Sequence, residues 1–374
     1  MERRSAGKLI MTKLLDEIRA MIAERGSITV EQYMQLALTH PDLGYYMNRD
    51  PFGATGDFTT APEVSQMFGE LVGLWTAEVW SSMGSPEPVR LVELGPGRGT
   101  LMSDALRAAR IVPAFRNALD VRLIETSPTL ASMQHELLID CGVAVSWAQS
   151  FKDIPDGPAI VIGNEFLDAL PVRQFVRVSG QWRERTVRLN GDGKLVFDVA
   201  DKPEPYIRAN AANGEVLEVN PSCHRLMFEL GARLVKQGGA ALLIDYGHAI
   251  TSYGDTLQAL RAHRYVDPLA APGDCDLTAH VDFAAMARSA SATGAAVYGP
   301  IDQGDFLRAI GIDLRTKALA ERASADRAEE FQRARARLVG KNQGEMGALF
   351  KAIAIADRKL RPPPGFQPLA AKSA

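Results

Sequence analysis

The chain has 374 residues, of which 46% are hydrophobic and 23% charged, as is ordinary for a folded enzyme of one large or two modest domains. Its net charge of −3 gives no electrostatic reason to expect nucleic acid as a partner. The sequence contains no run of about 18 apolar residues, so we expect no stable membrane insertion. The three cysteines and six histidines are spaced neither as a disulfide framework nor as metal ligands, so we expect a reducing, cytoplasmic environment and no metal.

The first part of the chain, residues 1–85, predicts a helical arm. One amphipathic helix begins at about Met11 and ends at Gly26, and a second stops before Pro41. A third helix starts at Ser65 and carries large apolar residues on the face that would pack into a core.

Between the second and third helices lies the polar stretch 42–63, which includes Thr59 and Thr60. Loops of this length inside compact domains are usually functional or disordered, and the aromatic residues embedded here favour function. We expect this loop to close over a ligand, with Thr59 and Thr60 among the residues that bind it.

The apolar run Val89–Leu94 predicts a buried parallel strand, and it ends in a turn with Gly95, Gly97 and Gly99. A helical pattern follows at once, so strand, glycine turn and helix form the first half of a nucleotide-binding βαβ unit. The same geometry can also be a plain tight turn.

An acidic residue, Glu93, ends this strand, and Thr100 stands where a dinucleotide-binding turn would have its last glycine. A carboxylate at that place would repel a pyrophosphate but suits a cationic ligand. S-adenosyl-L-methionine carries a sulfonium and an ammonium, so Glu93 favours it as the cofactor.

The next strand ends in Glu125, which in adenosine-binding folds of this kind accepts the ribose hydroxyls. The alternative is that Glu125 only caps the helix that follows. A third strand ends near Trp147 and Gln149, where the adenine would lie, although Trp147 could equally be core filling.

A fourth apolar strand, 159–163, runs directly into Asn164, Glu165 and Asp168. Ligands in open parallel sheets bind outside the carboxyl ends of the strands, so we expect these three polar groups to face the same crevice as Gly95 and Glu125. A surface charge or a helix cap is the alternative reading for each of them.

Residues 172–215 change character and predict an antiparallel β insertion, with a strong hairpin turn at 190–193. This insertion separates the first half of the core, 86–171, from the second half, 216–300. In the second half, a fifth strand again ends in a carboxylate, and the punctuated stretch 254–282, which holds His280, is expected to lie outside the core as a catalytic rim or a long connection.

The last segment, 301–374, predicts helices throughout. One charged helix runs to about Leu338, and an apolar stripe of Met346, Leu349, Phe350 and Ile353 predicts a final amphipathic helix. That stripe could belong to the core or to an interface, so a homo-oligomer is possible.

Seven strings together resemble the MidA-like family of class I methyltransferases, whose mitochondrial members assist assembly of respiratory complex I. The resemblance covers about residues 12 to 357, and the strings that carry it are Gly44–Tyr46, Gly56–Glu63, Phe68–Glu70, Glu93–Thr100, Asn164–Pro171, Asp245–Gly247 and Asp276–Phe283. Small departures, such as Leu167 where a Phe is common, do not touch the expected cofactor site.

The resemblance implies an α/β fold, namely a Rossmann-like class I methyltransferase sheet with an N-terminal helical arm, a β-hairpin insertion and C-terminal helices. It also implies S-adenosyl-L-methionine as cofactor and methylation of an arginine in a protein, a respiratory complex I-type subunit. The compartment would then be the cytoplasm of a bacterium or the mitochondrial matrix of a eukaryote.

For this reaction we expect Glu93 and the glycine turn to hold the methionine part of the cofactor and Glu125 its ribose. Glu165 and Asp168 would fork against the acceptor guanidinium, with Asn164 orienting them. His280 or Asp276 could accept the released proton.

Three other functions remain open from the sequence. A small-molecule methyltransferase would share the whole cofactor site. A non-catalytic assembly chaperone would bind the cofactor only structurally. A nicotinamide oxidoreductase could use Glu125, but Thr100 and Glu93 argue against it.

Overall fold

A computed structural model describes residues 2–47 and 59–366 of the chain, and these residues fold into two compact units. The first unit comprises Met1–Thr59, Asp168–His224 and Thr251–His280, and the second comprises Thr60–Leu167, Arg225–Ile250 and Val281–Ala374. Residues 1–85, expected to act as one arm, therefore divide between the two units after Thr59.

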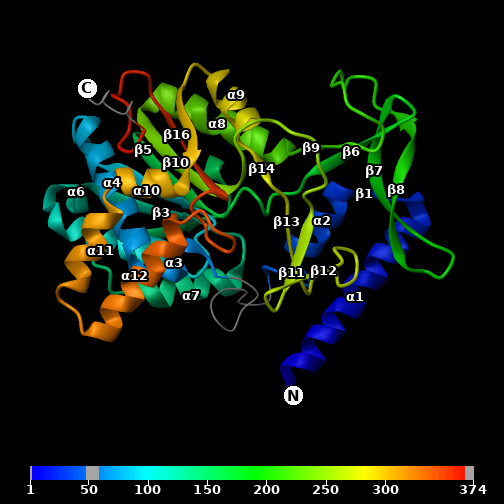
Figure 1. Ribbon diagram of the computed structural model, residues 1–374, viewed down its shortest axis with the longest axis horizontal. Coiled ribbons are helices and arrows are strands. Elements are labelled where there is room, and N and C mark those ends of the chain that lie inside the picture. Colours follow the sequence, from blue (N-terminus) through cyan, green and yellow to red (C-terminus); the bar gives the residue numbers. More distant parts are fainter. Residues whose placement is uncertain (1, 48–58, 367–374) are drawn as a thin grey trace. The chain divides into compact units, whose positions relative to one another are not determined.

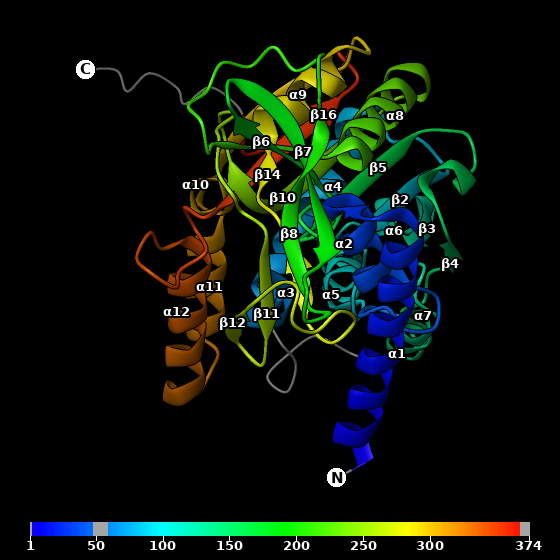
Figure 2. The ribbon, with the colours of Figure 1, turned by 90° about the vertical axis from the view of Figure 1, so that its right-hand side faces the viewer.

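The first unit is built on an antiparallel sheet in the order β1-β7-β6-β9, with β8 paired to β7. Figure 2 shows β7 and β8 lying along one another in green. The strands are β1 (Ile28–Thr29), β6 (Arg173–Val178), β7 (Gln181–Leu189), β8 (Leu195–Pro203) and β9 (Val216–Val219). The β insertion predicted from residue 172 onward is confirmed.

The turn between β7 and β8 follows the predicted hairpin chemistry. Asn190 Oδ1 accepts the backbone N–H groups of Asp192 and Lys194, and Gly193 adopts a left-handed φ of 72°. The short polar side chain of Asn190 thus satisfies the turn backbone that the strands leave unpaired.

The first unit also contains the helices α1 (Glu2–Arg25) and α2 (Val30–Thr39). The first of them begins at Glu2, nine residues before the predicted start, and ends as expected at Gly26. The second has a capping box, in which Thr29 and Gln32 each accept the other's backbone N–H. Figure 1 shows α1 and α2 in blue.

The stretch 254–282 was expected outside the core, and this expectation is wrong. It forms a small sheet in the order β12-β11-β13, and its strands are β11 (Gln258–Arg261), β12 (Arg264–Val266) and β13 (Asp276–Thr278). Its small apolar residues, which alternate with polar ones, join Leu14, Tyr33 and Val187 in one buried cluster. These residues are Ala259, Leu269, Ala271, Cys275, Leu277 and Ala279.

The second unit contains an eight-stranded sheet whose path runs β15-β16-β10-β5-β2-β3-β4, with β14 paired to β10. Its strands are β2 (Val89–Leu94), β3 (Leu119–Ile124), β4 (Val145–Ala148), β5 (Ala159–Asn164), β10 (Gly239–His248), β14 (Val281–Asp282), β15 (Ala296–Asp302) and β16 (Phe350–Ala356). The strands from β10 to β4 are mutually parallel, and β16 is antiparallel to both of its neighbours. This arrangement confirms the predicted Rossmann-like sheet.

Helices cover this sheet. They are α3 (Ala61–Val64), α4 (Gln66–Ser82), α5 (Thr100–Ala108), α6 (Pro113–Ala118), α7 (Pro128–Leu138), α9 (Phe283–Ser291), α10 (Gln303–Ala309), α11 (Ile312–Ala320) and α12 (Ala325–Val339), with single turns η1 (Ala109–Ile111) and η2 (Phe151–Asp153). The long α8 (Pro221–Gln237) begins in the first unit and continues in the second.

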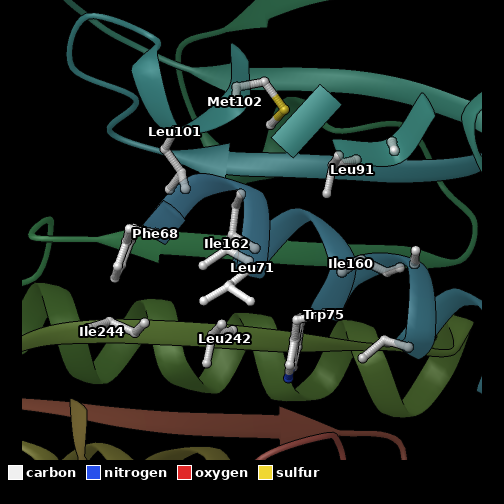
Figure 3. Close-up of a cluster of buried hydrophobic side chains, with 14 of the residues drawn as sticks. Phe68, Leu71, Trp75, Leu91, Leu101, Met102, Ile160, Ile162, Leu242 and Ile244 are labelled. Carbon is white, nitrogen blue, oxygen red and sulfur yellow. The ribbon is translucent and has the colours of Figure 1, made fainter. Parts of the chain in front are cut away.

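The main core of the second unit lies between α4 and the sheet. In Figure 3, Phe68, Leu71 and Trp75 of α4 point toward the apolar side chains of β5 and β10, among them Ile162 and Leu242. Because parallel strands are buried on both faces, β5 and β10 read as continuous apolar runs. That is why their positions could be predicted from the sequence.

The final amphipathic helix predicted at Met346–Ile353 is wrong, because β16 occupies Phe350–Ala356. Its residues alternate between Ala and Ile, and Ala352 through Ala356 are fully buried between β10 and β15. Pairing with two neighbouring strands satisfies the backbone here, so the tertiary context overrides a local spacing that also fits a helix.

Candidate functional site

The glycine turn after β2 has the backbone that only glycine adopts readily. Gly95, Gly97 and Gly99 have φ values of 58°, 55° and 86°, all in the left-handed region. A Cβ atom on Gly95 would lie 2.5 Å from Cδ2 of Phe166, so the Phe166 ring packs directly on this turn. Gly99 is the N-cap residue of α5, and it has no side chain that could accept the first backbone N–H groups of this helix.

Glu93, the last but one residue of β2, is 2% exposed. Among the described residues its Oε2 atom has no hydrogen-bond partner. Burial, together with the nearby Glu125 carboxylate, raises the pKa of Glu93 to about 8. A buried carboxylate oxygen without a partner is costly in a folded protein, and a cationic ligand would satisfy it.

Glu125 follows β3 and accepts hydrogen bonds on both of its carboxylate oxygens. Its Oε1 accepts the Ser127 backbone N–H at 2.8 Å, and its Oε2 accepts Nε2 of Gln134 at 3.0 Å. Burial raises the pKa of Glu125, while these donors oppose the shift. The bond to Ser127, which itself caps α7, matches the helix-cap reading, and binding of a ribose by the remaining lone pairs stays a prediction.

Gln134 is a residue that the sequence reading missed. It is fully buried, and its amide joins three parts of the turn region: it donates to Gly97 O at 2.7 Å and to Glu125, and it accepts the Trp147 indole N–H at 2.8 Å. A polar residue midway between Leu130 and Leu138, on the buried face of α7, was the signal that could have found it.

The four outer candidates have different surroundings. Trp147 is partly buried, packs against the main core and is held by Gln134, so it serves the core as well as the strand tip. Gln149 is exposed just beyond β4. Thr60 is buried at the start of α3, and Thr59 is the last residue of the first of the three stretches that form the first unit. The neighbouring string Gly56–Phe58 lies outside the described residues.

Asn164 is the last residue of β5 and Glu165 follows it directly, next to the end of β2 that carries Glu93. Glu165 has a left-handed φ of 52°, which is rare for a residue with a side chain and marks a backbone held by its surroundings. Its Oε1 accepts the Ala61 N–H at 2.8 Å and Nδ2 of Asn164 at 3.0 Å. The Oδ1 atom of Asn164 has no partner among the described residues.

The electrostatics of Glu165 are set mainly by burial, which raises the pKa of this carboxyl to about 7. The Ala61 and Asn164 donors lower it, Asp245 raises it, and the Arg337 guanidinium on α12 lowers it. A carboxyl poised near neutral pH at the end of a parallel strand is typical of a functional group.

The remaining two catalytic candidates belong to the first unit. The backbone carbonyl of Asp168 accepts the N–H of Ala279, which brings Asp168 beside the segment that carries His280. In the same unit Tyr46 donates its hydroxyl to Asp276 Oδ1 at 2.7 Å, and burial with Asp276 and Asp168 nearby raises the pKa of Tyr46. Asn164 and Glu165 thus share a unit with Glu93 and Glu125, whereas Asp168 and His280 share one with Tyr46.

The second unit can hold the predicted cofactor. The glycine turn exposes backbone to a close ligand, and the unpartnered oxygens of Glu93 and Asn164 offer acceptors to an ammonium or sulfonium group. Within the described ranges no group of three or more His, Cys, Asp or Glu side chains could hold a metal ion, and none of the helices there is long and apolar enough to cross a membrane.

Comparison with known proteins agrees with this chemistry. The family model described as "Putative S-adenosyl-L-methionine-dependent methyltransferase" matches residues 71–301. Proteins named protein arginine methyltransferase NDUFAF7, mitochondrial, are similar to the chain: that of Xenopus tropicalis is 37% identical, over 91% of this chain and 85% of its own length, and that of Homo sapiens is 37% identical over 84% and 77%.

Two crystal structures from Burkholderia thailandensis share the fold. One, bound to S-adenosyl-homocysteine, is 30% identical with a TM-score of 0.82 and covers 96% of this chain and 95% of its own. The other, determined in its native form, is 28% identical with a TM-score of 0.83 and covers 98% and 97%. The similarity therefore extends over both units of the chain.

Proposed function

Because the chain belongs to a family of S-adenosyl-L-methionine-dependent methyltransferases, we propose that it transfers a methyl group to an arginine of a protein substrate. The relatives named as protein arginine methyltransferases, at 37% identity over most of the chain, support this acceptor. We further propose that the substrate is a respiratory complex I-type subunit, and that the enzyme works where that complex is assembled, in a bacterial cytoplasm or a mitochondrial matrix.

The observation that carries the proposal is the Glu165 carboxylate, held in a left-handed turn after β5, beside the end of β2 that carries Glu93. One acidic group suits the cationic cofactor, and the other suits a cationic acceptor. S-adenosyl-L-methionine supplies an electrophilic methyl carbon on its sulfonium. Glu93 and the glycine turn would hold the methionine part, and Glu125, fixed by Gln134, the ribose.

The acceptor guanidinium is planar, and its charge is delocalised over three nitrogens. A carboxylate that takes two of its N–H groups fixes the plane and draws positive charge away from the third nitrogen. That nitrogen would form a bond to the methyl carbon while the bond from this carbon to sulfur breaks, and the proton that the nitrogen loses would pass to solvent water. Positioning of this kind can supply much of the acceleration. We assign the carboxylate role to Glu165.

The first test separates cofactor binding from methyl transfer. By calorimetry the wild type should bind S-adenosylhomocysteine and not NAD, and Glu93→Ala should weaken binding by about 10- to 100-fold, the worth of a hydrogen bond to a charged group. Glu165→Gln should keep the wild-type affinity within about threefold. Equal losses in the two variants would contradict the division of labour.

The second test identifies the acceptor. Cells that encode the chain would be compared with a deletion strain, and their respiratory complex I-type subunits analysed for methylarginine by mass spectrometry. We expect a methylarginine that disappears on deletion, returns with the wild-type gene and does not return with Glu165→Gln. A subunit with no deletion-dependent methylarginine, together with a methylated small molecule, would replace the protein substrate by a small one.

A further inference from the structure

The turn after β5 is held from a neighbouring strand by Asp245, a residue near the end of β10. The Asp245 carboxylate is 1% exposed, and its Oδ2 atom accepts two consecutive backbone N–H groups, from Phe166 at 3.0 Å and from Leu167 at 2.7 Å. Its Oδ1 atom accepts the N–H of Tyr246 at 2.7 Å. The carboxylate therefore has backbone donors on both oxygens.

These bonds explain the backbone at Glu165. When a residue adopts the left-handed conformation, the N–H groups that follow it turn to the same side and form a concave site for an anion. Here that site is filled by the Asp245 carboxylate, and the N–H of Glu165 itself donates to Ile244 O at 2.9 Å. Three successive N–H groups of the turn thus bond to β10, which offsets the cost of the φ of 52° at Glu165.

The same turn also contacts the glycine turn after β2. Phe166, whose N–H is bound by Asp245, lays its ring against Gly95, where even a Cβ atom would come within 2.5 Å. The turn is therefore fixed on one side by a carboxylate and on the other by packing on the glycine turn. A shift of this turn would move the Glu165 side chain relative to the ligand that the glycine turn binds.

We propose that Asp245 is a positioning residue for methyl transfer, which holds Glu165 at the acceptor by fixing the turn that carries it. This inference rests on the function proposed above for Glu165. Asp245 has a second effect on the same group, because its charge acts on the buried carboxyl. The charged groups that act on Glu165 are Asp245 from β10 and Arg337 from α12, and its hydrogen-bond donors are the Ala61 N–H from α3 and the Asn164 amide.

Two variants separate the hydrogen bonds from the charge. In Asp245→Asn the single amide oxygen can still accept both N–H groups of the turn, but the charge and the acceptor for Tyr246 are lost. In Asp245→Ala both the charge and all acceptors are lost. Asp104→Asn serves as a matched control, because Asp104 is also a buried aspartate of the second unit, is paired with Arg107 on its own helix and does not touch the turn.

The experiment uses the full-length protein labelled with ¹³C at the glutamate carboxyl carbons, with the Glu165 signal assigned from its absence in Glu165→Gln. We expect both Asp245 variants to lower the pKa of Glu165, because a negative neighbour has gone. In the deletion strain described above, we expect methylarginine to fall about threefold with Asp245→Asn and tenfold or more with Asp245→Ala. The S-adenosylhomocysteine affinity should stay within about threefold, and Asp104→Asn should match the wild type in all three measurements.

Several outcomes would overturn the proposal. One is a Glu165 titration and methylarginine level that are unchanged in Asp245→Ala. Another is a loss of S-adenosylhomocysteine affinity as large as in Glu93→Ala, which would place Asp245 in the cofactor site. If the proposed function itself fails, the wild type makes no methylarginine, while the titration of Glu165 still reports whether Asp245 sets the state of that carboxyl.

A measurement on the wild type covers the case in which Asp245→Ala does not fold. Hydrogen exchange at the Phe166 and Leu167 amides should be slow, since a buried carboxylate binds both. Exchange at these amides as fast as in an exposed loop would contradict the hydrogen bonds from Phe166 and Leu167 to Asp245, whatever the variants do.

Discussion

At the scale of single residues, three buried acids define the candidate site. Glu93, Glu125 and Glu165 lie at the ends of three neighbouring strands, and burial raises the pKa of each of them. Their differences come from their partners: Glu125 has donors on both oxygens, Glu165 has two donors on one oxygen, and the Oε2 atom of Glu93 has none among the described residues. The group with the fewest donors therefore has the strongest need for a cationic ligand.

Glu93 should make the cofactor-free protein less stable as the pH rises. Its pKa is about 8 in the folded chain and about 4.5 when unfolded, so the folded state binds the extra proton between these values. The contribution of Glu93 to the free energy of unfolding is fully present below pH 4.5 and is lost as the pH rises through 8. This loss amounts to at most about 5 kcal/mol.

The measurement for this prediction is urea unfolding at pH 5 and pH 9, on the wild type and on Glu93→Gln. The glutamine is neutral at every pH, so the variant should gain stability relative to the wild type between pH 5 and pH 9. An equal change with pH in both proteins would show that Glu93 is not a buried acid in the folded state.

Glu165 should give methyl transfer a pH dependence of its own. A carboxylate must be ionised to fork against a guanidinium, and the pKa of Glu165 is about 7. The rate should therefore rise by about tenfold between pH 6 and pH 8. Initial rates of tritium transfer from labelled S-adenosyl-L-methionine to the subunit identified by mass spectrometry would measure it. A flat profile over this range would remove Glu165 from the reacting state.

At the scale of elements, the turn after β2 and the turn after β5 pack against each other. The first needs glycine because of its left-handed backbone and because Phe166 packs on it. The second adopts a left-handed residue without glycine, because Asp245 and Ile244 bind its N–H groups. Glycine thus stabilises the turn after β2, and hydrogen bonds to β10 stabilise the turn after β5.

Gly95→Ala should test the first of these turns. The left-handed backbone costs a residue with a Cβ about 1–2 kcal/mol, and the contact with Phe166 adds about 1–3 kcal/mol of overpacking. We expect a loss of stability of about 2–5 kcal/mol and a loss of S-adenosylhomocysteine binding of tenfold or more. Calorimetry and thermal unfolding would measure both.

Gly193→Ala is the matched control for that variant. Gly193 also has a left-handed φ, of 72°, but a Cβ atom there would meet nothing within 4 Å. It should lose only the backbone share, about 1–2 kcal/mol, and bind S-adenosylhomocysteine as the wild type does. Similar losses at the two positions would show that the Phe166 contact has no energetic weight.

At the scale of the whole molecule, the chain divides into two units with separate cores. The proposed cofactor ligands belong to the second unit, around the parallel sheet, and the buried cluster of the first unit joins residues from three separate stretches of sequence. A ligand stabilises most strongly the elements that contact it.

Addition of S-adenosylhomocysteine should therefore slow hydrogen exchange mainly in three segments of the second unit, 93–100, 124–134 and 164–167. The β7–β8 hairpin of the first unit, 181–203, should change little. Exchange mass spectrometry with and without the ligand would measure this. Protection of the hairpin equal to that of the glycine turn would argue against a cofactor site built by the second unit.

The sequence by itself determined the elements whose signals are local. The strand, glycine turn and acid at Val89–Gly99, the strand that ends in Asn164 and Glu165, and the hairpin at 190–193 are each specified by neighbouring residues, because turn chemistry and buried parallel strands leave direct patterns. These patterns sufficed to predict the sheet and the cofactor, whereas the family was predicted from the resemblance of seven longer strings.

Only the tertiary structure decided the features whose partners lie far apart in the chain. The spacing of the apolar stripe at 346–353 fits a helix, but pairing with β10 and β15 makes its last part the strand β16. The punctuated stretch 254–282 belongs to the core because α1 and α2 supply its apolar partners. Asp245 reaches its turn across 79 residues, and Gln134 reaches Gly97 across 37. The free energy of such contacts comes from groups that no sequence window contains. Only the folded chain therefore shows that the Asp245 carboxylate bonds to the turn after β5, while the Oε2 atom of Glu93 has no partner among the described residues.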